Sequence, residues 1–173
     1  MNDFLLKAKH WQVFIFLANA YILSTYCTDN SLLSICTFAI LLVGYVGWYA
    51  LLGNILYGYL PGKIDYSITW FLFDAILLII VYGVILILFD GNLEVNGLAA
   101  ILFFYLLFAF VHLFWLPAVL VVSIETKHKP EFSQYAGTML QLFFWPIGIW
   151  FVQPRFNKIY NAIQADTLDY PRP

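Results

Sequence analysis

The sequence predicts an all-α membrane protein, with four transmembrane helices followed by a shorter apolar segment. Apolar residues make up 63% of the chain and charged residues only 10%, whereas about a quarter of the residues in a soluble domain are charged. The stretch 98–122 contains no Asp, Glu, Lys or Arg. About 20 apolar helical residues are enough to cross a bilayer, so this stretch can span one with some tilt.

The predicted helices follow one another with short connections. They cover residues 11–27, 32–60, 70–89 and 98–123. Basic residues before the first helix suit an anchor at the membrane surface. Turn-forming residues separate the helices, among them Pro61-Gly62 and the segment 90–97. We therefore expect a single transmembrane domain over residues 1–160 and a polar, loosely ordered tail over residues 161–173.

The apolar segment 135–153 is either a fifth crossing or a re-entrant or in-plane hairpin. The run Trp145-Pro146-Ile147-Gly148 places a helix breaker in its middle. With four crossings all the basic residues lie on one side, namely Lys7, Lys9, Lys63, Lys127, Lys129, Arg155, Lys158 and Arg172. The positive-inside rule makes that side cytoplasmic. We therefore favour four crossings, with both termini in the cytoplasm.

Small residues on the second helix predict its packing face. The residues that recur at helical spacing on one side are Gly44, Gly47, Leu51, Asn54 and Gly58. Small side chains let helix backbones approach closely within a membrane. We expect this face to contact a neighbouring helix of the same chain, and a contact with a second copy is the alternative.

Four polar side chains lie inside the predicted helices: Asn19, Asn54, Asp74 and His112. An ionisable residue within a membrane is costly unless it is paired, and it is a functional candidate by default. In the functional interpretation Asp74 and His112 carry protons or ions in a cavity open to the cytoplasm. In the structural interpretation, which we favour, they hold helices together. Counting about 1.5 Å per residue from the helix ends separates Asp74 and His112 by about 9 Å in depth, which predicts no direct bond.

The sequence predicts no catalytic residue, cofactor or metal site. It contains no GxSxG motif, and its three histidines lack the spacing of metal ligands. The scattered basic residues form no patch for nucleic acid. Cys27 and Cys36 flank the first outer connection, where a disulfide is conceivable in an oxidising compartment, although we favour two free thiols.

The two ends of the chain have the most distinctive motifs, KAKHWQVF at 7–14 and FFWPIGIWFVQPRFNKIY at 143–160. They resemble small uncharacterised polytopic membrane proteins of bacteria that have a KHWQ start and a PIGIWF-Q-P-R-x-N-K end. The resemblance covers only these two ends. It implies a protein of the bacterial inner membrane and brings no known activity or site residues.

The second motif also suggests an interfacial edge. Its members are Trp145, Trp150, Gln153, Arg155 and Lys158. Aromatic rings prefer headgroup depth, and cations attract lipid phosphates. A lipid headgroup or a partner subunit could dock at this edge, and ordinary anchoring is the alternative that we favour.

Three classes of function remain open. The first, which we favour, is a non-enzymatic subunit or scaffold of a larger membrane assembly. The lack of catalytic motifs, the short loops and the glycine packing face support it. The second is a small transporter or channel that uses Asp74 and His112. The third, an enzyme acting on lipid, needs clustered acids, His or Cys at the interface, which the sequence lacks. The expected partners are the bilayer and a membrane protein or a second copy.

Overall fold

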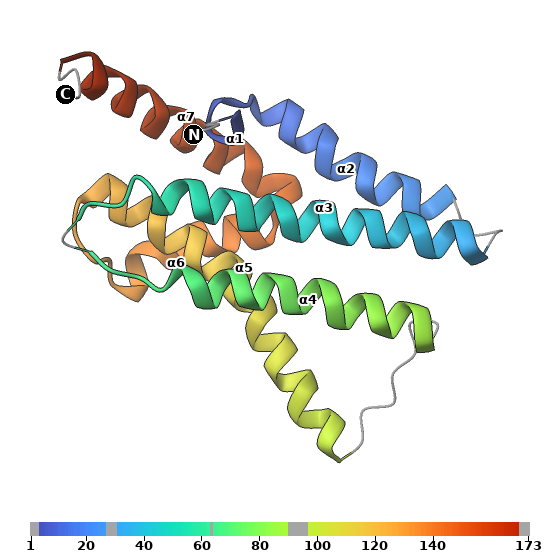
Figure 1. The fold of residues 1–173 in the computed structure, drawn as a ribbon. Helices are drawn as coiled ribbons and strands as arrows, with labels where there is room; N and C mark the ends of the chain where they lie inside the picture. Colours follow the sequence, from blue (N-terminus) through green and yellow to red (C-terminus); the bar gives the residue numbers. More distant parts are fainter. Residues whose placement is uncertain (1–3, 27–30, 63, 90–96, 170–173) are drawn as a thin grey trace. The chain divides into compact units, whose positions relative to one another are not determined.

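The computed structural model describes residues 4–26, 31–62, 64–89 and 97–169, and it confirms the all-α class for them. In these residues all the regular secondary structure is helical (Figure 1). The helices are α1 (Phe4–Lys7), α2 (His10–Tyr26), α3 (Ser31–Tyr57), α4 (Ile68–Phe89), α5 (Leu98–Thr126), α6 (Phe132–Phe143) and α7 (Trp145–Asp169). Helices satisfy their own backbone hydrogen bonds, which a chain in lipid requires.

Among the described residues, three helices are long and apolar enough to cross a membrane. The spanning stretches are Cys36–Tyr57 in α3, Ile68–Leu86 in α4 and Ala100–Thr126 in α5. Their length and composition are those of membrane-spanning helices. The predicted first crossing corresponds to α2, which has 17 residues in the described part of the chain. That length covers about 26 Å against a hydrocarbon core of about 30 Å, so α2 is not among the three.

The chain divides into two compact units. One consists of Leu17–Leu51 and Tyr66–Leu116, and we call it the apolar unit. The other consists of Met1–Phe16, Leu52–Asp65 and Pro117–Pro173. All eight Lys and Arg residues of the sequence fall within the ranges of this second unit, which we therefore call the basic unit.

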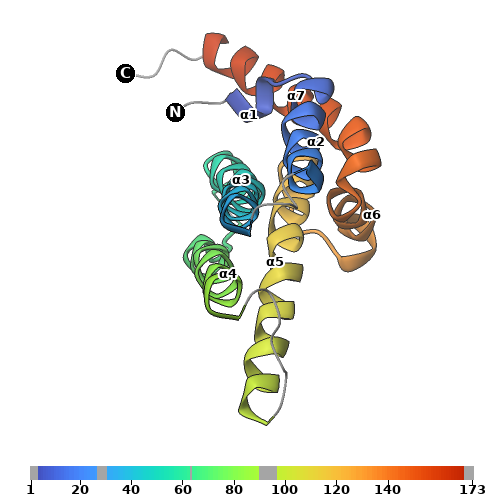
Figure 2. The same cartoon turned by 90° about the vertical axis from the view of Figure 1, so that its right-hand side faces the viewer.

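Within the apolar unit, aromatic side chains connect the helices. The helices α3 and α4 run side by side, and α5 crosses the N-terminal half of α4 (Figures 1 and 2). The rings of Phe38 in α3 and Tyr82 in α4 stack with centroids 5.7 Å apart. Tyr49 of α3 meets Phe114 of α5 edge to face at 5.0 Å. Large rings, rather than close backbone approach, make these contacts.

The predicted packing face of α3 is wrong in this chain. A Cβ atom added at Gly47 would meet nothing within 4 Å. Leu51 is 58% exposed, and Asn54 and Gly58 are exposed as well. The buried side of α3 instead contains large residues such as Tyr49 and Leu52. A contact of the glycine face with a second copy remains a prediction.

The basic unit contains a helical hairpin formed by α6 and α7. The chain breaks its helix at Phe144, so Pro146 falls in the first turn of α7, where a missing backbone N–H costs nothing. The predicted break within 135–153 is thereby confirmed. Neither α6 nor α7 is among the three spanning helices. Residues 161–169, predicted as a loose tail, belong to α7.

The two arms of the hairpin approach each other closely at Gly148. A Cβ atom at this position would clash with the backbone oxygen of Gln141 in α6. Backbone atoms cannot move aside as a flexible side chain can, so only glycine fits here. The short helix α1 also packs against α7.

Gly148→Ala should therefore destabilise the hairpin. Forcing atoms into packed space costs about 1–3 kcal/mol or more, and the clash here is with backbone. The matched control is Gly137→Ala in α6, because a Cβ atom at Gly137 meets nothing within 4 Å. Thermal unfolding in detergent should show a clear loss for Gly148→Ala and none for the control. Equal unfolding temperatures would contradict the close approach.

Candidate functional site

Asp74 lies on the buried side of α4. Its neighbours on that side are Phe71, Ala75 and Leu78, at the spacing of one helical face. Asp74 itself is only 3% exposed. A carboxylate at such a position needs partners, because burying an unpaired charge is very unfavourable.

Two side chains of α5 supply these partners. The hydroxyl of Tyr105 donates to Oδ1 of Asp74 at 2.7 Å. Nδ1 of His112 lies 2.6 Å from Oδ2 of the same carboxylate. Tyr105 and His112 are seven residues apart, so two helical turns place them on the same face of α5. Both oxygens of Asp74 are thus engaged from one neighbouring helix.

Aromatic rings surround the imidazole of His112. Phe71 of α4 lies at a centroid distance of 5.7 Å, and Phe108 and Trp115 of α5 lie at 5.7 and 5.3 Å. The His112 side chain is 11% exposed. The site is therefore an acid and a base in direct contact inside an apolar, aromatic environment.

This pair can hold or release one proton. A carboxylate with an imidazolium and a carboxylic acid with a neutral imidazole contain the same number of protons, and neither has a net charge. Losing one proton leaves a carboxylate and a neutral imidazole, with a net charge of −1. The protonation state of Asp74 and His112 thus sets the charge between α4 and α5.

The second ring nitrogen of His112, Nε2, is not the one that contacts Asp74. Among the described residues, none is a hydrogen-bond partner of Nε2. A histidine held at Nδ1 by a carboxylate presents its Nε2 in a fixed direction. The arrangement suits proton transfer between Asp74 and a group or water that reaches Nε2.

The expected separation of Asp74 and His112 is wrong, since the two side chains are in direct contact. The depths of Asp74 and His112 were counted from the cytoplasmic ends of the two helices, on the assumption that both ends lie at the membrane surface. However, α5 has 29 residues, about 43 Å of helix, which exceeds the bilayer core. Its end therefore does not mark the membrane surface, and depths counted from it are misleading.

The other two residues of the predicted polar cluster do not share these features. Asn19 and Asn54 are both exposed. Both carboxylate oxygens of Asp74 already have partners in α5. Sequence reasoning missed Tyr105, although its spacing from His112 places both residues on one helical face.

The predicted interfacial edge is wrong for Gln153. This residue is 0% exposed, and its Nε2 donates to the backbone oxygens of Leu5 at 3.0 Å and Ala8 at 2.8 Å. One turn later in α7, the side-chain amide nitrogen of Asn157 donates to the backbone oxygen of Leu6 at 2.5 Å. This holds for the orientation of the amide in which both its oxygen and its nitrogen face suitable partners. These amides attach the N-terminal segment to α7 by capping carbonyls near the end of α1.

Arg155 also has a structural position. Its guanidinium donates to both carboxylate oxygens of Glu125 in α5, at 2.9 and 2.5 Å, and to Thr138 of α6 at 2.7 Å. Of the remaining predicted edge residues, Trp145 is half-buried, and Trp150 and Lys158 are exposed.

The two end motifs contact each other. The ring of His10 lies 4.4 Å from that of Trp150, and Phe14 lies 5.9 Å from Trp145. The KHWQ start and the PIGIWF-QPRFNK end therefore form one packed element. Of the two cysteines considered for a disulfide, Cys27 lies outside the described residues. Cys36 is a free, exposed thiol.

Comparison with protein-family models, curated proteins and solved structures finds no match to this chain. Within the residues that the structure describes, no three His, Cys, Asp or Glu side chains converge as metal ligands.

Tyr105→Phe should weaken the contact between α4 and α5 by about 1 kcal/mol, since hydrogen bonds between membrane helices contribute about 0.6–1.7 kcal/mol. The matched control is Tyr82→Phe, which removes the hydroxyl of an exposed α4 residue that stacks on Phe38. Unfolding in detergent should show a larger loss for Tyr105→Phe. The site would be in doubt if the two variants were equally stable.

Proposed function

We propose that this protein is a small proton-linked transporter or channel of the bacterial inner membrane, with Asp74, His112 and Tyr105 as its proton site. The observation that supports this proposal is the direct contact between the Asp74 carboxylate and the His112 imidazole. The two groups come from different helices, and both helices are long enough to span a membrane. Ionisable residues that pair within membranes often mark ion or proton pathways.

The site also offers a way to couple protonation to movement. Taking up or releasing one proton changes both the charge and the hydrogen bond that join α4 to α5. Where two helices share one titratable contact, protonation can favour one arrangement of the helices over another. Asp74 would bind the proton, His112 would exchange it through Nε2, and Tyr105 would orient the carboxylate.

The proposed topology has four crossings, including α2, with both termini in the cytoplasm. It is supported by the charges, because all eight basic residues belong to the basic unit and none to the apolar unit. If α2 did not cross, Lys7 and Lys9 would lie on the opposite side from the other basic residues. The positive-inside rule favours the arrangement with α2 as a crossing. In it, the hairpin of α6 and α7 lies along the cytoplasmic surface.

A second candidate is a non-enzymatic subunit or scaffold of a membrane assembly. The open face of α3 favours it, since Gly47 has free space in front of it and Leu51 and Asn54 are exposed. A partner protein or a second copy could cover this face. The Asp74 contact would then serve to hold α4 and α5 together.

Proton flux into liposomes separates the two candidates. The purified chain is reconstituted with a pH-sensitive dye inside the vesicles, and a potassium gradient with valinomycin supplies the driving force. Wild-type protein should acidify or alkalinise the lumen according to the direction of the imposed potential. Asp74→Asn keeps the shape of the side chain but removes its ionisable proton, so flux should fall to the level of empty vesicles. The variant should stay folded, because the Asn side chain can still form hydrogen bonds with Tyr105 and His112.

The matched control is Asp65→Asn, which removes an exposed acid outside the three spans and should leave flux unchanged. Wild-type flux no greater than that of empty vesicles would reject the transporter. Lower stability or partner retention in Asp74→Asn would then favour the subunit or scaffold.

A further inference from the structure

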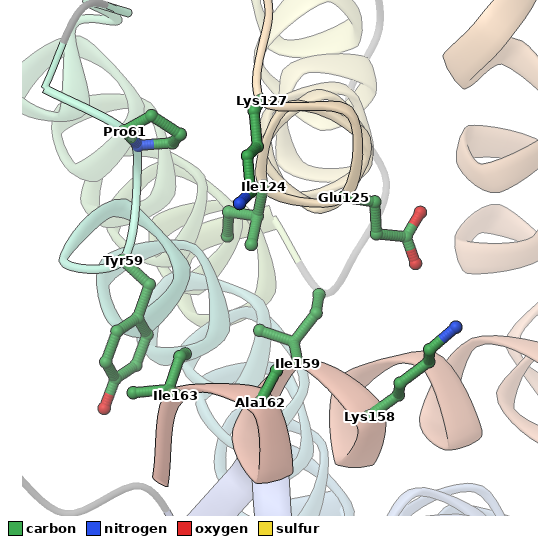
Figure 3. Close-up of a pocket in the computed structure, with 9 residues that line it drawn as sticks. All are labelled: Tyr59, Pro61, Ile124, Glu125, Lys127, Lys158, Ile159, Ala162 and Ile163. Carbon is green, nitrogen blue, oxygen red and sulfur yellow. The ribbon is translucent and has the colours of Figure 1, made fainter. Parts of the chain in front are cut away.

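We propose that a pocket in the basic unit binds one anionic phospholipid of the cytoplasmic leaflet. The pocket has a volume of about 710 Å³ and lies between the segment after α3, the end of α5 and the second half of α7 (Figure 3). Its volume lies within the range of about 300–1,000 Å³ that is typical of ligand sites. The proposal depends on the protein's being in a membrane and is independent of the proton site.

The pocket has an apolar wall suited to a hydrocarbon chain. Ile159, Ala162 and Ile163 follow one another at the spacing of one face of α7, and Ile124 of α5 and Pro61 complete the wall. A free phosphate or another small hydrophilic anion would gain nothing from such a wall. An acyl chain would remove this apolar surface from water, which is favourable.

Two lysines lie beside this wall. Lys127, directly after the end of α5, and Lys158 of α7 both line the pocket (Figure 3). Within the described chain neither ammonium group forms an ion pair. The backbone of Lys127 is fixed by the end of α5. Its N–H donates to the backbone oxygen of Ser123 at 2.9 Å, and its φ of 59° is the left-handed conformation that commonly ends a helix.

The only acid that lines the described pocket is already neutralised. Glu125 binds the Arg155 guanidinium through both of its oxygens. Such a bidentate pair leaves the carboxylate with little to offer either lysine. The pocket is therefore positively charged beside an apolar wall, which complements a phosphate headgroup joined to an acyl chain.

A phospholipid is the occupant that fits both features. Anionic lipids attract basic residues close to a membrane surface. All the basic residues of the chain belong to the unit that contains the pocket. The positive-inside rule assigns that unit to the cytoplasmic side. We therefore assign the site to a phospholipid with a net negative headgroup, such as phosphatidylglycerol.

Native mass spectrometry of the full-length protein in detergent tests this assignment. Phosphatidylglycerol should be retained in preference to phosphatidylcholine at a stoichiometry of one. Each lysine near an anionic headgroup contributes a factor of about 5 in affinity, so Lys127→Gln with Lys158→Gln should weaken binding about 30-fold. The control is Lys7→Gln, which removes an exposed lysine of the same unit outside the pocket and should have no effect.

A second variant tests the acyl chain. Ala162→Trp fills the apolar wall without changing the charge, so it should abolish retention of phosphatidylglycerol while the unfolding temperature stays the same. Equal retention of the two lipids by wild-type protein would overturn the assignment, as would an equal loss in Lys7→Gln. Binding of glycerol phosphate as tightly as phosphatidylglycerol would also overturn it, because the headgroup alone would then be the ligand.

Discussion

The buried carboxylate of Asp74 constrains how α4 and α5 pack in the apolar unit. It is buried on α4, and a buried carboxylate without partners is very unfavourable, so its two oxygens need donors within the protein. Tyr105 and His112 provide them from one face of α5. That requirement fixes the rotation of α5 about its axis relative to α4. An apolar pair of helices could slide or rotate with little loss, whereas this one has a defined register.

The basic unit is organised by different chemistry. Main-chain carbonyls of the N-terminal segment accept hydrogen bonds from the amide of Gln153. Arg155 joins α7 to both Glu125 and Thr138, and Gly148 lets α6 and α7 meet at their backbones. Gln153 and Arg155, which the sequence predicted at an interfacial edge, thus form hydrogen bonds within the basic unit. Among the described residues, Lys127 and Lys158 take part in none of these ion pairs, so their ammonium groups can face a ligand.

Composition was sufficient to predict the fold class, and the helix break near Pro146 follows from proline chemistry. The relation between helices was harder to predict. Periodicity shows that Tyr105 and His112 share a face, but it does not show which helix lies opposite or at what height. Periodicity also predicted that the glycines of α3 form a packing face. However, a Cβ atom at Gly47 would meet nothing within 4 Å, and the large ring of Tyr49 contacts Phe114 of α5 instead. Residue spacing describes one helix, whereas sites are made between helices.

Nitrogen-15 NMR of histidine-labelled protein tests most directly whether His112 and Asp74 share a proton. The signals of His112 can be assigned by their loss in His112→Gln. If the Nδ1 hydrogen bond to the carboxylate exists, the Nδ1 resonance and its pH dependence should change strongly in Asp74→Asn, while His10 and His128 stay as they are. Identical His112 resonances and titration in the wild type and Asp74→Asn would show that the two groups are not coupled, and would contradict the proposed proton site.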